Sequence, residues 1–110
     1  MTELADEYLE ARAEFIQVQG KLRRIRDTVT TVAQILHSRP DHLIFRDLSS
    51  ADPRVGKGRV EIAAEDWPTA EQLQALLVCW RAARKRMLDC WRRLPRDQQA
   101  TVEPPLKIEW

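Results

Sequence analysis

Apolar residues recur at alternating steps of four and three along residues 2–37, and this spacing constrains the fold more than any other feature of the chain. All ten positions of the series are apolar, so a repeat of about 3.5 residues is kept over almost five heptads. Amphipathic helices of globular domains drift from such a register, and its retention is typical of coiled-coil packing. The series, which predicts a helix over residues 2–37, consists of Leu4, Tyr8, Ala11, Phe15, Val18, Leu22, Ile25, Val29, Val32 and Leu36.

A second helix is predicted over residues 69–94. Thr69 and Gln72 have the spacing of a capping box at its start, and Pro95 ends the apolar pattern. Two further apolar residues, Leu77 and Trp91, widen the stripe, as expected for a helix with more than one neighbour. The stripe itself comprises Leu73, Leu76, Trp80, Ala83, Met87, Cys90 and Leu94.

The connector, residues 38–66, and the tail, residues 95–110, are less regular. Residues 42–48 and 59–63 have weak strand character around a turn-rich stretch, which fits a short β-hairpin or an ordered loop. We expect the tail to be extended over residues 95–110, since Pro104 and Pro105 favour an extended backbone. Leu106, Ile108 and Trp110 alternate with polar residues. We expect this strip to fold back on the helices or to dock on a second subunit, with binding of another protein as the alternative.

Charge is segregated along the chain, although its formal net value is only +1. Residues 1–19 carry five acids against one base, and residues 20–39 carry five bases against one acid. An antiparallel pairing of the two helices places acidic residues 3–14 beside basic residues 81–96. Such complementarity favours one orientation more than it adds stability, because each exposed pair contributes only about 0.2–1 kcal/mol.

The predicted fold is mainly all-α: a long antiparallel helical hairpin in one domain, residues 1–110, assembling as a dimeric four-helix bundle. A first helix of about 50 Å, at ~1.5 Å per residue, is too long for a compact monomer of this size. Self-association of two hairpins in an antiparallel homodimer buries the apolar residues that the single interface within one hairpin leaves exposed. The predicted bundle interface is Leu4, Tyr8, Phe15, Val18, Leu22, Ile25, Val29, Val32, Leu36, Leu73, Leu76, Leu77, Trp80, Met87, Trp91 and Leu94.

The stretch CWRAARKRMLDCWRRLPR, residues 79–96, contains seven bases and a single acid. None of the bases falls on the apolar stripe, and we interpret the tryptophans as core anchors that lie apart from the charged outer face. A nucleic-acid-associated protein is nevertheless the alternative function, because clustered positive charge suffices to contact phosphates. Its candidate residues are Arg81, Lys85, Arg86, Arg92, Arg93 and Arg96.

No motif predicts an enzyme, a cofactor or a metal centre. His37 and His42 match no compact metal-site spacing, and residues 55–59, VGKGR, lack the pattern of a phosphate-binding loop. Cys79 and Cys90 are too far apart on one helix for a disulfide, and we interpret them as buried thiols. The longest apolar run is short, and the acidic N-terminal sequence is unlike a signal peptide, so we expect a cytoplasmic protein without a membrane partner.

These observations favour a small non-enzymatic helical assembly or adaptor protein that acts through protein–protein contacts. Short coiled-coil hairpins of this kind occur in many unrelated settings, including small bacterial and phage accessory proteins. The predicted contact surfaces are the bundle, the connector and the C-terminal tail.

Overall fold

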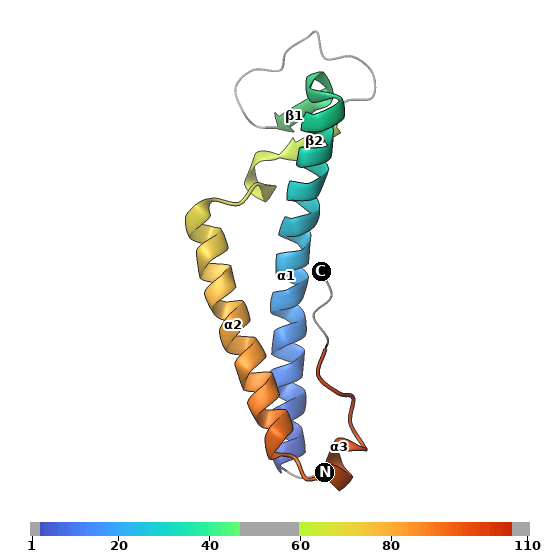
Figure 1. Ribbon diagram of the computed structural model, residues 1–110. Helices are drawn as coiled ribbons and strands as arrows, with labels where there is room; N and C mark the ends of the chain where they lie inside the picture. The colour runs from blue at the N-terminus through green and yellow to red at the C-terminus, as the bar shows by residue number, and fades with distance from the viewer. Residues whose placement is uncertain (1–2, 47–59, 107–110) are drawn as a thin grey trace. The chain divides into compact units, whose positions relative to one another are not determined.

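The protein is mostly helical in its computed structural model, which describes residues 3–46 and 60–106. Figure 1 shows its elements in chain order. Contacts within the chain divide it into two compact units. One, the helical unit, comprises Met1–Lys21 with Gln74–Trp110, and the other, the sheet unit, comprises Leu22–Leu73. The elements are α1 (Glu3–Ser38), η1 (Pro40–His42), β1 (Leu43–Arg46), β2 (Val60–Ala63), η2 (Ala64–Asp66), α2 (Ala70–Arg93) and α3 (Arg96–Gln99).

Both long helices lie where the apolar periodicity predicts them. The start of α2 is a capping box. The Thr69 hydroxyl oxygen accepts from the backbone N–H of Gln72, and the Gln72 side-chain oxygen accepts from the backbone N–H of Thr69, each at 3.1 Å. These two bonds satisfy donors that the first helical turn would otherwise leave unpaired. The capping prediction is therefore confirmed.

Within the helical unit, α1 and α2 run antiparallel and are held in register by two aromatic pairs. The rings of Tyr8 and Trp91 lie 5.1 Å apart, and those of Phe15 and Trp80 lie 6.0 Å apart. The order of the contacts along α1 is thus the reverse of their order along α2, so the helices are antiparallel, as the charge pattern predicts. The buried core of this unit comprises Ala5, Tyr8, Ala11, Phe15, Ala83, Met87, Cys90 and Leu94.

The tail folds back onto this core, as expected. Val102 and Leu106 pack against the core cluster, and the Tyr8 hydroxyl donates to the Glu103 carbonyl oxygen at 2.6 Å. Arg12 adds a bond to the Pro104 carbonyl oxygen at 3.2 Å and an ion pair with Glu103 at 2.9 Å. The end of the predicted apolar strip, Ile108 and Trp110, lies outside the described residues.

The prediction that the tail is extended from residue 95 onward is wrong at its start. Residues Arg96–Gln99 form one helical turn, α3. The Gln99 side-chain amide donates to the Trp91 carbonyl oxygen at 2.9 Å, near the end of α2. The same carbonyl oxygen accepts from the Leu94 backbone N–H at 3.1 Å, so the Gln99 side chain adds a second donor to it. The short helix α3 therefore adds a side-chain hydrogen bond to the end of α2 before the chain becomes extended.

The sheet unit contains two short strands, but they do not form the β-hairpin that was one of the two predictions. β1 and β2 pair in parallel, with Leu43 opposite Val60 and Arg46 opposite Ala63. A two-residue hairpin turn joins only antiparallel strands, whereas parallel strands need a longer return connection. Residues 47–59 make that connection and lie outside the described residues. The Phe45 and Trp67 rings meet edge to face at 5.7 Å.

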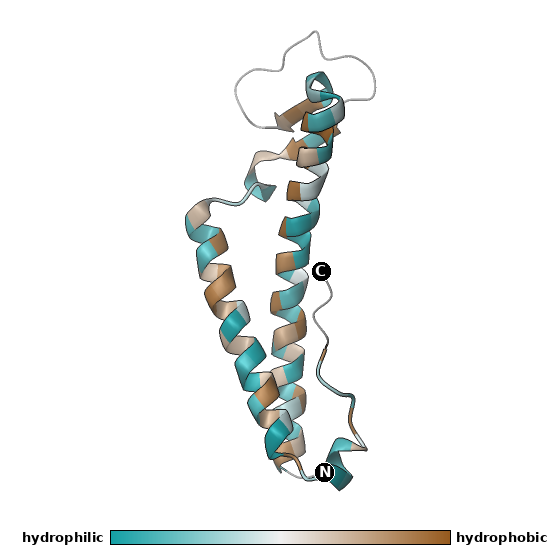
Figure 2. Cartoon of the chain, viewed as in Figure 1, coloured by the Kyte–Doolittle hydropathy of each residue, from teal (hydrophilic) through white to brown (hydrophobic). Residues whose placement is uncertain are grey.

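The heptad positions of α1 are not all buried within the chain. Tyr8 and Phe15 are fully buried, whereas Leu4, Val29 and Leu36 are 37%, 39% and 57% exposed. Near the C-terminal end of α1 two residues are buried: Val32, which belongs to the predicted series, and Ile35, which lies outside it. Figure 2 shows hydrophobic residues alternating with hydrophilic ones along both long helices. Part of the stripe therefore remains available, and the dimeric bundle stays a prediction.

Gly20 lies inside α1, is exposed, and has no atom within 4 Å of the position that a Cβ would take. Replacing Gly20 with Ala should therefore stabilise the protein by roughly 0.5–1 kcal/mol, because alanine loses less backbone entropy in a helix. Urea unfolding followed by circular dichroism measures the change. A loss of stability instead would show that another chain packs against this glycine.

Burial raises the pKa of Tyr8, against the opposing influence of the Arg12 guanidinium. The neutral phenol is the form that donates to Glu103, so its stabilising contribution should be complete below pH ~10, the ordinary tyrosine pKa, and be lost as pH rises further. Tyr8 is the single tyrosine of the chain, so the ultraviolet absorbance of tyrosinate reports its titration directly. We expect a midpoint above that of the urea-unfolded chain.

Tyr8→Phe is the matched control, since it keeps the ring and removes only the hydroxyl. Its thermal unfolding should depend less on pH in the alkaline range than that of the wild type. Equal midpoints in the folded and unfolded chains would contradict the buried, donating hydroxyl.

Candidate functional site

The basic residues of α2 divide between two flanks of the helix. Arg86 and Arg93 are seven residues apart and share the flank that faces α1. Arg86 bonds to the Glu14 carboxylate at 2.6 Å, and Arg93 lies 3.8 Å from that of Glu7. Two of the six candidate phosphate-contacting residues are therefore paired with the acidic part of α1, as the antiparallel pairing predicts.

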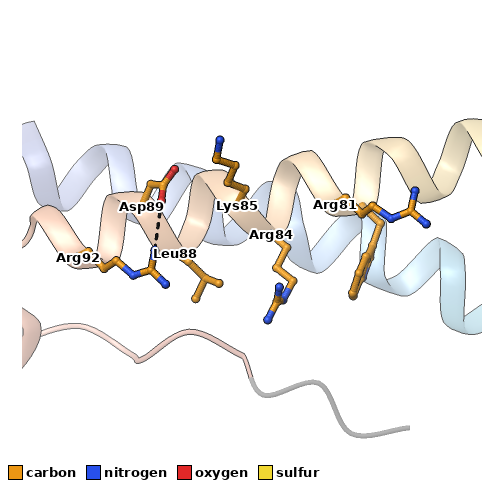
Figure 3. Close-up of a pocket in the computed structure, with 7 residues that line it drawn as sticks. Arg81, Arg84, Lys85, Leu88, Asp89 and Arg92 are labelled. Carbon is orange, nitrogen blue, oxygen red and sulfur yellow. Dashed lines mark ion pairs between the residues drawn. The ribbon is translucent and has the colours of Figure 1, made fainter.

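The other flank of α2 forms a shallow pocket of about 230 Å³. All of its lining residues belong to α2 and to the helical unit, and Figure 3 shows their side chains. Leu88 and Arg84 project to one side in this view, while Lys85 and Asp89 project to the other. The pocket is lined by Trp80, Arg81, Arg84, Lys85, Leu88, Asp89 and Arg92.

Four bases and one acid surround this pocket. Arg92 and Asp89 lie 3.5 Å apart in a loose ion pair, and the Arg92 side chain is 72% exposed. Within residues 3–46 and 60–106, Arg81, Arg84 and Lys85 have no acidic partner. The local charge of the lining is therefore strongly positive (four positive charges against one), although the whole chain is nearly neutral. A surface of this kind attracts carboxylates and phosphates.

Trp80 forms the apolar side of the pocket and is held rigidly. Its indole N–H donates to the Gln19 side-chain oxygen at 2.5 Å, and its ring packs beside Phe15. Gln19 is 5% exposed and is the one buried polar side chain among the described residues. The buried Gln19 oxygen, as the acceptor of the indole N–H, fixes the orientation of the indole, because leaving either group unpaired costs free energy.

Sequence reasoning located this site only in part. Arg81, Lys85 and Arg92 are in the predicted basic set, but Arg84 and Leu88 were missed. The separation of tryptophans from bases is also wrong for Trp80, which contacts the core and lines the pocket at once. The spacing of residues 81, 84, 88 and 92, which places them along one helical face, is the sequence signal by which this pocket could have been predicted. Arg96 lies in α3, away from the pocket lining.

The remaining candidate groups do not assemble into a reactive centre in the part of the chain that is described. No cluster of three or more His, Cys, Asp or Glu side chains suited to a metal ion occurs there. His42 lies 3.6 Å from Asp41, and His37 is exposed at the end of α1. Residues 55–59 lie outside the described residues. Neither α1 nor α2 has an apolar segment long enough to cross a bilayer.

The two cysteines differ in environment. Both thiols are free; Cys90 is buried in the core, whereas Cys79 is exposed. The interpretation of both as buried thiols is therefore wrong for Cys79. Its neighbour Val78 is likewise exposed, at 53%. The prediction followed the general tendency of free cysteines to be buried, which Cys90 alone obeys.

Comparison of the chain with protein-family models gave no match, and neither did comparisons with curated proteins and with solved structures.

The Gln19–Trp80 bond predicts a stability effect that surface glutamines do not share. Gln19→Leu removes the acceptor and leaves the indole N–H unpaired, which should cost roughly 1–3 kcal/mol. Gln17→Leu is the matched control, since Gln17 is exposed on the same helix and its replacement should change stability by less than about 0.5 kcal/mol. Urea unfolding of both variants measures the difference. Equal stability of the two variants would show that the bond does not hold Trp80.

Proposed function

We propose that the protein is a small non-enzymatic assembly or adaptor protein that acts through protein–protein contacts as an antiparallel homodimer. The observation that carries the proposal is the set of apolar heptad positions left exposed on α1: Leu4, Val29 and Leu36. Exposed apolar residues that keep a seven-residue register are typical of helices that pack against another helix. Val29 and Leu36 are one heptad apart.

The positions of these residues and the charge of α1 favour the same orientation. Leu4 lies at one end of α1 and Leu36 at the other, so antiparallel pairing of two copies brings these exposed residues together. It also sets the acidic first half of one α1 against the basic second half of the other. A parallel pairing would oppose like charges along the whole helix, which costs free energy. Closed twofold symmetry satisfies both requirements with a single type of contact.

Light scattering coupled to size exclusion tests this proposal at micromolar protein concentration. The wild-type chain should elute with twice the monomer mass. The double variant Val29→Glu with Leu36→Glu should elute as a monomer, because charged groups cannot be buried in an apolar contact without partners.

Ile16→Glu is the matched control for that variant. Ile16 is 43% exposed on the same helix but lies outside the heptad series, so its replacement should leave the dimer intact. A monomeric wild-type protein, or dissociation by Ile16→Glu alone, would overturn the homodimer.

The proposal includes a cytoplasmic location, supported by the two unpaired thiols, since secreted small domains use cysteines for disulfides. A nucleic-acid-associated protein is the second candidate function. It is favoured by the bases of the pocket that have no acidic partner among the described residues, Arg81, Arg84 and Lys85. It is weakened by the pairing of Arg86 and Arg93 with α1, which neutralises two of the six predicted phosphate-contacting residues.

A further inference from the structure

We infer that the pocket on α2 binds an acidic peptide segment of a partner protein, with one apolar side chain of that segment seated against Trp80 and Leu88. This inference rests on the proposed function in protein–protein contact and adds the chemistry of the partner. The pocket combines two features that a carboxylate-rich segment with a central apolar residue would match: an apolar wall and a rim of bases. Interfaces commonly join a buried apolar anchor with a polar rim.

The rim is positive because its neutralisation within the chain is incomplete. Glu14 and Glu7, the acids of α1 that reach α2, contact Arg86 and Arg93 on the other flank. The pocket retains Arg81, Arg84 and Lys85 without a carboxylate from the described residues. Asp89 holds Arg92 at one end of the pocket through a long, exposed contact. Carboxylates from another chain are therefore the missing complement.

The dimensions of the pocket set the length of the segment. Arg81 and Arg92 are eleven residues apart on α2, which is about 16 Å along the axis at ~1.5 Å per residue. An extended peptide rises about 3.3 Å per residue, so roughly five residues span the rim. Acidic residues at both ends of such a segment reach the bases, and the central side chain faces Trp80 and Leu88.

Two observations favour a peptide over nucleic acid in this pocket. Asp89 lies within the lining, and its half-exposed carboxylate can accept from the backbone N–H of a peptide, a donor that a phosphodiester backbone lacks. The Trp80 indole is also half-buried, fixed by Gln19 and packed beside Phe15, so its remaining exposed surface suits one apolar side chain better than a stacked base. Stacking of successive bases requires open aromatic faces beside a continuous basic groove.

The test uses the full chain and a fluorescein-labelled peptide of sequence Glu-Asp-Leu-Asp-Glu, followed by fluorescence anisotropy at low and moderate salt. The wild-type protein should bind this peptide. Binding should weaken by about tenfold or more for Arg84→Glu and for the pair Arg81→Glu with Lys85→Glu, since each reversal replaces attraction with repulsion. Replacing the central Leu of the peptide with Ser should also weaken binding, because the apolar contact is lost.

Arg23→Glu is the matched control, an equal charge reversal at an exposed base of α1 outside the pocket. It should change the affinity by less than about twofold at moderate salt, since Arg23 does not line the pocket and exposed charges that make no direct contact are screened by salt. Circular dichroism of each variant separates lost binding from lost folding. The inference is overturned if the peptide does not bind at low salt, if Arg23→Glu weakens binding as much as Arg84→Glu, or if the central Ser is tolerated.

A labelled single-stranded DNA of matched length provides the competing outcome. Tighter binding of the DNA than of the peptide, lost in the same pocket variants, would overturn the inference in favour of phosphate contact. Light scattering on the same samples keeps the two proposals distinguishable: a monomer that still binds the peptide refutes the homodimer alone, and a dimer that does not bind it refutes the peptide site alone.

Discussion

The packing of α1 against α2 through two aromatic pairs is the interaction on which the helical unit depends. Tyr8 meets Trp91 and Phe15 meets Trp80, seven residues apart on one helix and eleven on the other. Large rings that pack at two levels fix both the direction and the register of the pair, because any slip of one turn separates both contacts. The contacts of the tail and the ion pairs between the two helices take their positions from this register.

One consequence is that charge on α2 is sorted by the packing. The residues turned toward α1, Arg86 and Arg93, find carboxylates there. Those turned away, among them Arg84 and Lys85, do not find one within the described residues. The ion pairs are exposed and contribute little to stability. Their effect is to divide one basic helix into a flank neutralised by α1 and a flank that stays positively charged, so that the positive charge of α2 lies on one side of the helix.

A second consequence is that Tyr8 joins the core to the tail. Its ring packs in the core while its hydroxyl bonds to the Glu103 carbonyl, so one side chain links three segments. Arg12 reinforces the link through two contacts with neighbouring tail residues. The tail thereby covers an edge of a core that two helices cannot enclose, since a helical hairpin has a single internal seam.

The sequence by itself determined the two helices, the capping box at Thr69 and the antiparallel direction, because periodicity, caps and segregated charge are local or act along one element. Tertiary structure alone decided that β1 and β2 pair in parallel, that Ile35 is buried while Leu36 is exposed, and that Trp80 borders the basic pocket. It also decided the bond from Tyr8 to the tail. Each of these depends on which distant segment reaches a given face, and no residue pattern within one element encodes that neighbour.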